Sequence, residues 1–139
     1  MKIIIATDDA CVGKFLDEFK KDVITPFYPD DPDNFLKDAT EQAILEALLN
    51  AQEHGNGNAT AKKITIEWFV ISSHLVVSVA DEGAGFTPAI PTGPPPRGSR
   101  RGRGLLIIST TPNAIFNFNE KGNKITLIFN KTNFSRTKP

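Results

Sequence analysis

The sequence is poor in the residues that would assign it to several common classes of small protein. Its one cysteine, Cys11, excludes an internal disulfide and a cysteine-rich zinc site. Acidic and basic residues number 16 each, so bulk charge does not attract this chain to polyanions. No apolar run approaches the roughly 18 residues that span a bilayer, and the apolar start at Met1–Ile5 turns acidic too soon for a signal peptide. We expect a soluble, cytoplasmic protein with one domain over residues 1–131 and a polar tail over residues 132–139.

The stretch from Asp33 to Gly55 organises the rest of the sequence. It predicts a long amphipathic helix, with Asp33 as the N-cap and Gly55 as the stop signal. Its central apolar run is interrupted only by Glu46 and Asn50. Four residues advance a helix by about 400° and about 6 Å, so these two side chains point the same way. A carboxylate and an amide therefore share one edge of the helix.

Two interpretations of this polar edge remain open. In the first interpretation, the edge is the solvated face of a core helix, as most polar stripes are. In the second, Glu46 is a general base beside the metal ligand Asn50. An ionised carboxylate can accept a proton, and an amide oxygen is a hard ligand suited to Mg²⁺. The helix alone does not distinguish the two.

Periodicity along the chain predicts an α+β fold. Apolar runs that alternate or are β-branched predict strands over residues 2–6, 62–70, 75–80, 114–119 and 124–130. A helix capped by Asp8 or Asp9 is expected to run to about Ile24, and a short helix is expected to begin at Leu105. Residues 86–101 contain five of the ten prolines and predict a long loop of the kind that serves as a lid. Because helices and hairpins are segregated, we expect a two-layer α/β sandwich, with helices on one face of a mixed or antiparallel sheet.

Two glycine-containing segments flank the predicted loop. Asp81-Glu82-Gly83-Ala84-Gly85-Phe86 follows a predicted strand, and a bend without Cβ atoms lets a flat ligand approach the backbone. Gly102-Arg103-Gly104-Leu105 opens a predicted helix, where free N–H groups and the helix dipole favour a phosphate. Arginines that suit phosphate oxygens crowd the same segment: Arg97, Arg100, Arg101 and Arg103. Taken singly, each segment is equally consistent with a solvated turn or a basic loop.

The order of these motifs resembles the ATP-binding domain shared by histidine kinases, type II topoisomerases and MutL, known as the GHKL or Bergerat fold. The sequence is most similar to the anti-sigma-factor serine/threonine kinases of the SpoIIAB and RsbW type. Those kinases carry E-A-x-x-N-A-x-x-H-G, D-x-G-x-G-F and G-R-G-L. The matching segments here are Glu46–Gly55, Asp81–Phe86 and Gly102–Leu105, and the resemblance covers about residues 1 to 130.

The resemblance implies roles for the matching residues. Glu46 would be the general base that accepts the proton of a protein serine hydroxyl, and Asn50 would hold the Mg²⁺ that bridges the phosphates of ATP. Asp81 would read the adenine amino group, with Gly83 and Gly85 flanking the base.

The resemblance also implies a phosphate-binding segment. The phosphates would be wrapped by Gly102, Arg103, Gly104 and the adjoining Leu105, helped by Arg100 or Arg101. Phosphoryl transfer depends mostly on positioning and on neutralising charge, so this short set of residues is chemically sufficient.

The sequence departs from the family pattern in the lid and in the last hairpin. Family members often have acidic and proline residues in the lid, whereas this lid is basic and very rich in proline. The glycine of the last hairpin, here Gly122, is usually followed by a threonine near the adenine, and Asn123 takes that place. No long N-terminal region with a phosphoacceptor histidine precedes the domain, so a two-component histidine kinase is not expected.

Three functions compete on this evidence. The first is a Mg·ATP-dependent serine kinase that sequesters a sigma factor and phosphorylates a STAS-type anti-anti-sigma factor, as a homodimer if the resemblance extends so far. The second is a nucleotide-binding regulatory or interaction module without kinase activity. The third, nucleic-acid binding through the arginine-rich loop, is disfavoured by the zero net charge and by the lack of interleaved aromatic residues.

Overall fold

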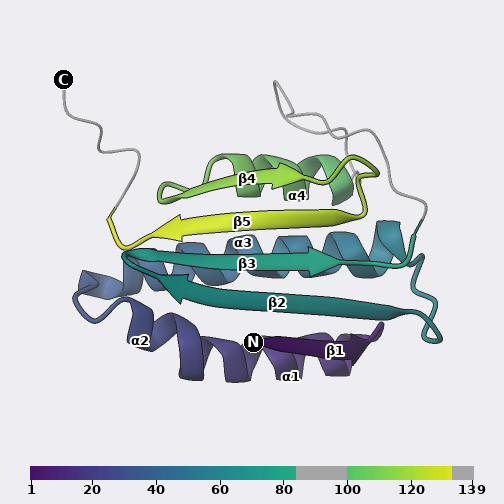
Figure 1. Ribbon diagram of the computed structural model, residues 1–139, viewed down its shortest axis with the longest axis horizontal. Helices are drawn as coiled ribbons and strands as arrows, with labels where there is room; N and C mark the ends of the chain where they lie inside the picture. Colours follow the sequence, from purple (N-terminus) through teal and green to yellow (C-terminus); the bar gives the residue numbers. More distant parts are fainter. Residues whose placement is uncertain (84–99, 133–139) are drawn as a thin grey trace.

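A computed structural model of the chain describes residues 1–83 and 100–132 and contains a five-stranded sheet. The strands are β1 (Lys2–Ala6), β2 (Lys63–Ile71), β3 (His74–Ala80), β4 (Ala114–Phe118) and β5 (Lys124–Asn130). Their order is β1-β2-β3-β5-β4, and every neighbouring pair is antiparallel (Figure 1). The two predicted hairpins are β2–β3 and β4–β5, so the strand predictions are confirmed to within one or two residues.

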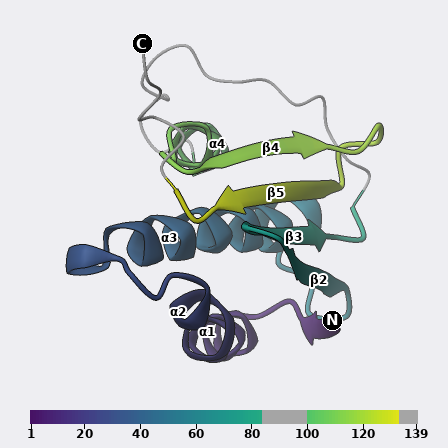
Figure 2. The same ribbon diagram turned by 60° about the vertical axis from the view of Figure 1, so that its left-hand side comes forward.

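The helices lie on one face of this sheet, as the expected sandwich requires (Figures 1 and 2). They are α1 (Asp9–Phe19), α2 (Thr25–Phe27), α3 (Phe35–Asn50) and α4 (Arg100–Ser109). Wider π-helical turns continue two of them: η1 (Lys20–Ile24) joins α1 to α2, and η3 (Ala51–Gly55) extends α3. A short 3₁₀ turn, η2 (Pro32–Asn34), precedes α3. Within the described residues, no helix combines the length and apolarity needed to cross a bilayer.

The core lies between the sheet and the helices because alternate strand residues point toward α1, α3 and α4. The buried strand residues are Ile64, Ile66, Leu75, Val77, Val79, Ile125, Leu127 and Phe129. Those that meet them from the helical layer include Phe15, Phe19, Ile44, Leu48 and Ile108. The single tryptophan, Trp68, packs edge-on against the rings of Phe15 and Phe19.

The predicted start of α1 is confirmed, with Asp8 as the N-cap. The carboxylate of Asp8 accepts a hydrogen bond from the backbone N–H of Cys11 at 2.7 Å. This bond to the ionised form is the main cause of a lowered pKa for Asp8. The helix does not end at Ile24, however, but continues to Phe27. The wider π-helical turn η1 accommodates Pro26 at the start of α2, where its missing N–H costs little.

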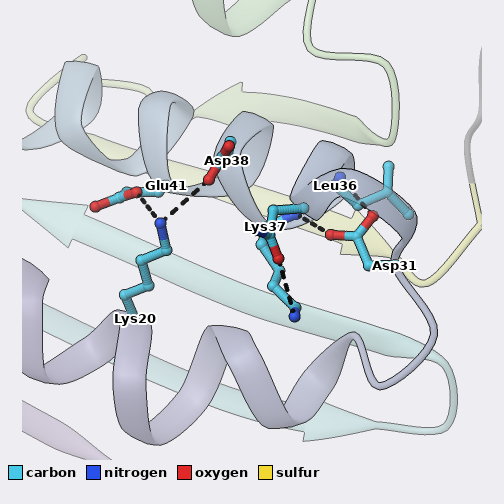
Figure 3. Close-up of polar contacts among 7 residues, drawn as sticks. Lys20, Asp31, Leu36, Lys37, Asp38 and Glu41 are labelled. Atoms are coloured by element: carbon cyan, nitrogen blue, oxygen red, sulfur yellow. Dashed lines mark hydrogen bonds and ion pairs between the residues drawn. The ribbon is translucent and has the colours of Figure 1, made fainter.

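The predicted N-cap of the long helix, Asp33, is wrong. Asp33 and Asn34 both adopt left-handed backbone conformations, with φ of 57° and 59°. This double reversal brings the carboxylate of Asp31 under the first turn of α3. Its two oxygens accept hydrogen bonds from the N–H groups of Leu36 and Lys37, each at 2.8 Å (Figure 3). One carboxylate therefore satisfies two of the donors that a helix start leaves free.

Polar contacts tie α3 to the helix before it. The ammonium of Lys20 lies 2.7 Å from Glu41 and 3.1 Å from Asp38 on α3 (Figure 3). Hydrogen bonds to Glu41 and then to Asp38 raise the pKa of Lys20. These contacts join η1 to the first half of α3, before Glu46 and Asn50.

A buried hydrogen-bond network connects α2, α3 and the start of β4. The hydroxyl of Tyr28 lies 2.6 Å from the hydroxyl of Thr40 and accepts a hydrogen bond from the amide of Asn113. The same amide donates to the backbone oxygen of Asn130 at 3.1 Å. Burial is the largest cause that raises the pKa of Tyr28, to about 12, so the ring stays neutral and can donate.

Candidate functional site

The edge of α3 that carries Glu46 and Asn50 is not a solvated helix face. The Glu46 side chain is only 3 % exposed, and Asn50, four residues later, is partly buried. Gln42, one turn earlier, donates from Nε2 to Oε2 of Glu46 at 2.8 Å. Burial of a carboxylate is costly, so this position favours a chemical role over a solvating one.

At the carboxyl end of α3, two glycines and an aspartate lie in close contact. A Cβ atom on Gly55 would lie 2.2 Å from Cγ and Oδ2 of Asp81, and a Cβ atom on Gly83 would lie 2.1 Å from the backbone oxygen of Gly55. The N–H of Gly83 donates to Oδ1 of Asp81 at 2.7 Å. Both positions therefore need glycine, and the contact fixes Asp81 beside the last turn of the helix.

The π-helical turn η3 makes this contact possible. The N–H of Asn56 donates to the backbone oxygen of Ala51 at 2.8 Å, a bond across five residues. The added width turns Gly55 toward the end of β3, and such turns recur at functional sites. Gln52 holds the same turn to the start of α1, since its Nε2 donates to Asp9 at 2.7 Å.

Asn56 is a structural residue of the site that the sequence did not single out. Its side chain is 2 % exposed and connects three segments. Its Nδ2 donates to Oγ1 of Thr7 at 2.8 Å and to the backbone oxygen of Lys63 at 3.0 Å, and its Oδ1 accepts from the N–H of Glu82 at 2.8 Å. In the sequence it stands in a polar, turn-rich segment, where local pattern carries no sign of these distant partners.

The turn between β4 and β5 places Asn123 against the Asp81 segment. The backbone oxygen of Asn123 accepts from the N–H of Asp81 at 2.9 Å, and its side-chain Nδ2 lies 3.5 Å from the backbone oxygen of Gly83. Asn119 shapes this turn, because its Oδ1 accepts from the N–H groups of Gly122, Asn123 and Lys124. The substituted asparagine is therefore adjacent to the aspartate that was expected to bind a purine.

The helix of the predicted phosphate-binding segment begins earlier than expected. α4 starts at Arg100, so Arg100 and Arg101 belong to a helix and not to the predicted loop. Helices α3 and α4 pack together, and Leu105 is buried, which extends the helix through two glycines of poor helix propensity. The free N–H groups of the first turn are accordingly those of Arg100, Arg101 and Gly102. Arg103 and Gly104 follow in the same helix, while Gly85 and Arg97 lie outside the described residues.

These elements meet at one end of the molecule. Figure 1 shows the carboxyl end of α3, the end of β3, the β4–β5 turn and the start of α4 on the same side. Gly55 follows Glu46 by nine residues, a rise of about 13 Å, with Asn50 between them. The Glu46 carboxylate and the Gly55–Asp81 contact are therefore separated by more than two turns of helix, with Asn50 between them.

The donor set also fits a magnesium ion that is bound mainly through phosphates. No cluster of three or more His, Cys, Asp or Glu side chains that could hold a metal occurs among residues 1–83 and 100–132. Mg²⁺ in nucleotide sites needs only one or two protein oxygens, because phosphates and water complete its coordination. The amide of Asn50, beside the Glu46 carboxylate, can supply one such oxygen.

Comparison with known proteins agrees with this arrangement. Residues 32–129 match the family described as Histidine kinase-like ATPase domain, and this range includes Glu46, Asn50, Asp81 and the start of α4. No curated protein matches the sequence significantly. The family match covers well over half of the 139 residues, and the antiparallel sheet with helices on one face is the expected architecture. This chain therefore belongs to the histidine kinase-like ATPase domains, a family of ATP-binding domains.

Proposed function

We propose that this protein is a Mg·ATP-dependent serine/threonine protein kinase of the anti-sigma-factor type. The observation that carries the proposal is the buried carboxylate of Glu46, which shares one edge of α3 with Asn50. Glu46 accepts the proton of the attacking serine hydroxyl, and Asn50 would hold a Mg²⁺ ion through its amide oxygen. Such an ion would supply neutralisation of the charge on the phosphates.

The remaining residues of the site bind and orient the nucleotide. Asp81 accepts a hydrogen bond from the adenine amino group, and the close contact of Gly55 with Asp81 and Gly83 holds that carboxylate in place beside the base. The first turn of α4 presents N–H groups to the phosphates, near the positive end of the helix dipole. Because the transfer step requires mainly positioning and charge neutralisation, these residues are sufficient for catalysis.

We further propose that the phosphate acceptor is a serine of a small STAS-type anti-anti-sigma factor and that the protein sequesters a sigma factor, acting as a homodimer. The support is the likeness of three segments, Glu46–Gly55, Asp81–Phe86 and Gly102–Leu105, to the kinases of that group. The alternative is a regulatory module that binds nucleotide without transferring phosphate. Both functions require ATP binding, so they differ only at the transfer step.

The test separates binding from transfer. Calorimetry with ATP, with and without Mg²⁺, should show Mg-dependent binding that Asn50→Ala reduces. Incubation with γ-labelled ATP and each STAS-type protein of the same genome should label one of them on serine. Glu46→Gln should keep ATP binding and reduce labelling by about 10²–10⁴-fold, the usual contribution of a general base.

A matched control lies on the same helix. Glu41→Gln removes a carboxylate that pairs with Lys20, away from the site, and should leave both binding and labelling unchanged. Tight Mg·ATP binding with no labelled partner would establish the regulatory module. Absence of ATP binding at millimolar concentration would reject both functions.

A further inference from the structure

In the part of the chain that the structure describes, no strand pairs with the outer edge of β2 over its last three residues. β1 pairs with Lys63–Glu67, and Met1 exchanges two backbone hydrogen bonds with Trp68, of 2.8 and 2.9 Å. The next residues, Phe69, Val70 and Ile71, are 54 %, 54 % and 59 % exposed. Proteins usually protect an apolar strand edge with charges, proline or a covering segment, so an uncovered one indicates a pairing surface.

The backbone of Val70 is oriented to pair with an added strand. Backbone groups alternate in direction along a strand, and those of Trp68 point toward β1. The N–H and C=O of Val70, two residues later, therefore point to the same side. Among residues 1–83 and 100–132, none forms a backbone hydrogen bond with Val70 on that side.

A hollow of about 440 Å³ lies beside this edge. Its apolar lining comes from Val23, Pro26, Phe27, Trp68, Phe69 and Val70, and its charged lining from Met1, Asp22 and Lys131. Figure 1 shows α2, the end of β2 and the end of β5 together at this end of the molecule, opposite the nucleotide site. The Nζ of Lys131 lies 5.4 Å from the centre of the Phe27 ring, and no carboxylate of the described residues pairs with it.

We propose that this edge and hollow bind an extended segment of another protein as a short additional strand. A branched or aromatic side chain of that segment enters the hollow against Phe27 and Val70, and its neighbours lie beside Phe69 and Ile71, since strand side chains alternate. One acidic residue of the segment pairs with Lys131. The volume is sufficient for a few side chains. This surface is separate from the proposed kinase site and does not depend on it.

The hydrogen-bonding part of the proposal can be tested with one substitution. Val70→Pro removes the outward N–H, and the β2–β3 ladder retains its bonds because Val70 and Leu75 form a non-hydrogen-bonded pair. A phage library of random twelve-residue peptides is selected on the full chain, with counter-selection on Val70→Pro. The peptides recovered should alternate apolar and polar residues and carry one Asp or Glu. Circular dichroism should show that the variant is folded.

The recovered peptides then report on the hollow directly. Trp68 is the only tryptophan and lines the hollow, so a bound peptide should shift its fluorescence. Val70→Pro should weaken binding about tenfold, the upper range for a lost hydrogen bond. Lys131→Glu, a change at an exposed residue, should reverse the preference from acidic to basic peptides. Ile115→Ser is the control, because Ile115 is equally exposed, at 55 %, on the opposite edge strand.

Three outcomes would overturn the proposal. The first is that no peptide distinguishes the full chain from Val70→Pro. The second is that Lys131→Glu leaves peptide preference unchanged, a result that holds even if Val70→Pro fails to fold. The third is concentration-dependent self-association in sedimentation velocity that Phe69→Ser abolishes, which would assign the edge to a second copy of this chain.

Discussion

Gly83→Ala should damage the proposed nucleotide site through a single added methyl group. The new Cβ would lie 2.1 Å from the backbone oxygen of Gly55 and 2.7 Å from its carbonyl carbon, whereas ordinary contacts begin at 3.4 Å. Both neighbours are backbone atoms, so relief requires the end of α3 and the Asp81 bend to separate by more than an ångström. Overpacking of this kind costs about 1–3 kcal/mol, which lowers the Tm of a domain of this size by roughly 3–10 °C.

The same change should weaken ATP binding by more than it weakens the fold, because Asp81 moves with the bend. The assays are thermal unfolding and calorimetric titration with Mg·ATP. Gly13→Ala is the matched control: a Cβ there meets nothing within 4 Å, and the exchange in a helix should stabilise the protein by about 0.5–1 kcal/mol. A Gly83→Ala protein with unchanged Tm and unchanged ATP affinity would refute the reasoning.

Three further predictions concern the scaffold. Tyr28→Phe should reduce the free energy of unfolding by about 1–3 kcal/mol in urea titrations, because it removes one of the two acceptors of the buried Asn113 amide and the hydroxyl partner of Thr40. Asp31→Ala should cost about 1–2 kcal/mol by the same assay, while Asp33→Ala costs much less; equal losses would contradict the cap seen here. The folded-state pKa of Asp8 lies below its ordinary 3.8, so the stability it adds is present above pH 3.8 and is lost as pH falls through the lowered pKa. The stability difference between wild type and Asp8→Ala should therefore disappear in acid titrations, and a difference that persists at the lowest pH would exclude this cause.

Local signals were sufficient for most of the fold. The two hairpins follow from alternating apolar residues separated by turn residues, and α3 follows from its long apolar run. The start of α4 could not be read in this way, since Gly102 and Gly104 lower helix propensity where packing of Leu105 against the core favours a helix. The cap by Asp31 was equally hidden, because it depends on two left-handed residues that follow it.

In the candidate site, too, local spacing predicted some features, and others depend on contacts between distant parts of the chain. The shared direction of Glu46 and Asn50 follows from their spacing, but the burial of Glu46 depends on neighbours that spacing does not reveal. Asn56 shows the limit most clearly, since its partners Thr7 and Glu82 are 49 and 26 residues away. Contacts of that range are set by the packed sheet and leave no periodic trace in the sequence.

The π-helical turn η3 makes the site sensitive to changes in chain length as well as to changes in residue type. Each residue of a helix rotates the chain by about 100°, so deleting one residue between Asn50 and Gly55 would turn everything that follows by that angle. Gly55 would lose its contact with Asp81, and the Asn56 side chain would lose its hydrogen bonds to Thr7, Lys63 and Glu82. A variant of this chain that retained every motif residue but was one residue shorter here would have lost the spatial frame in which those residues act.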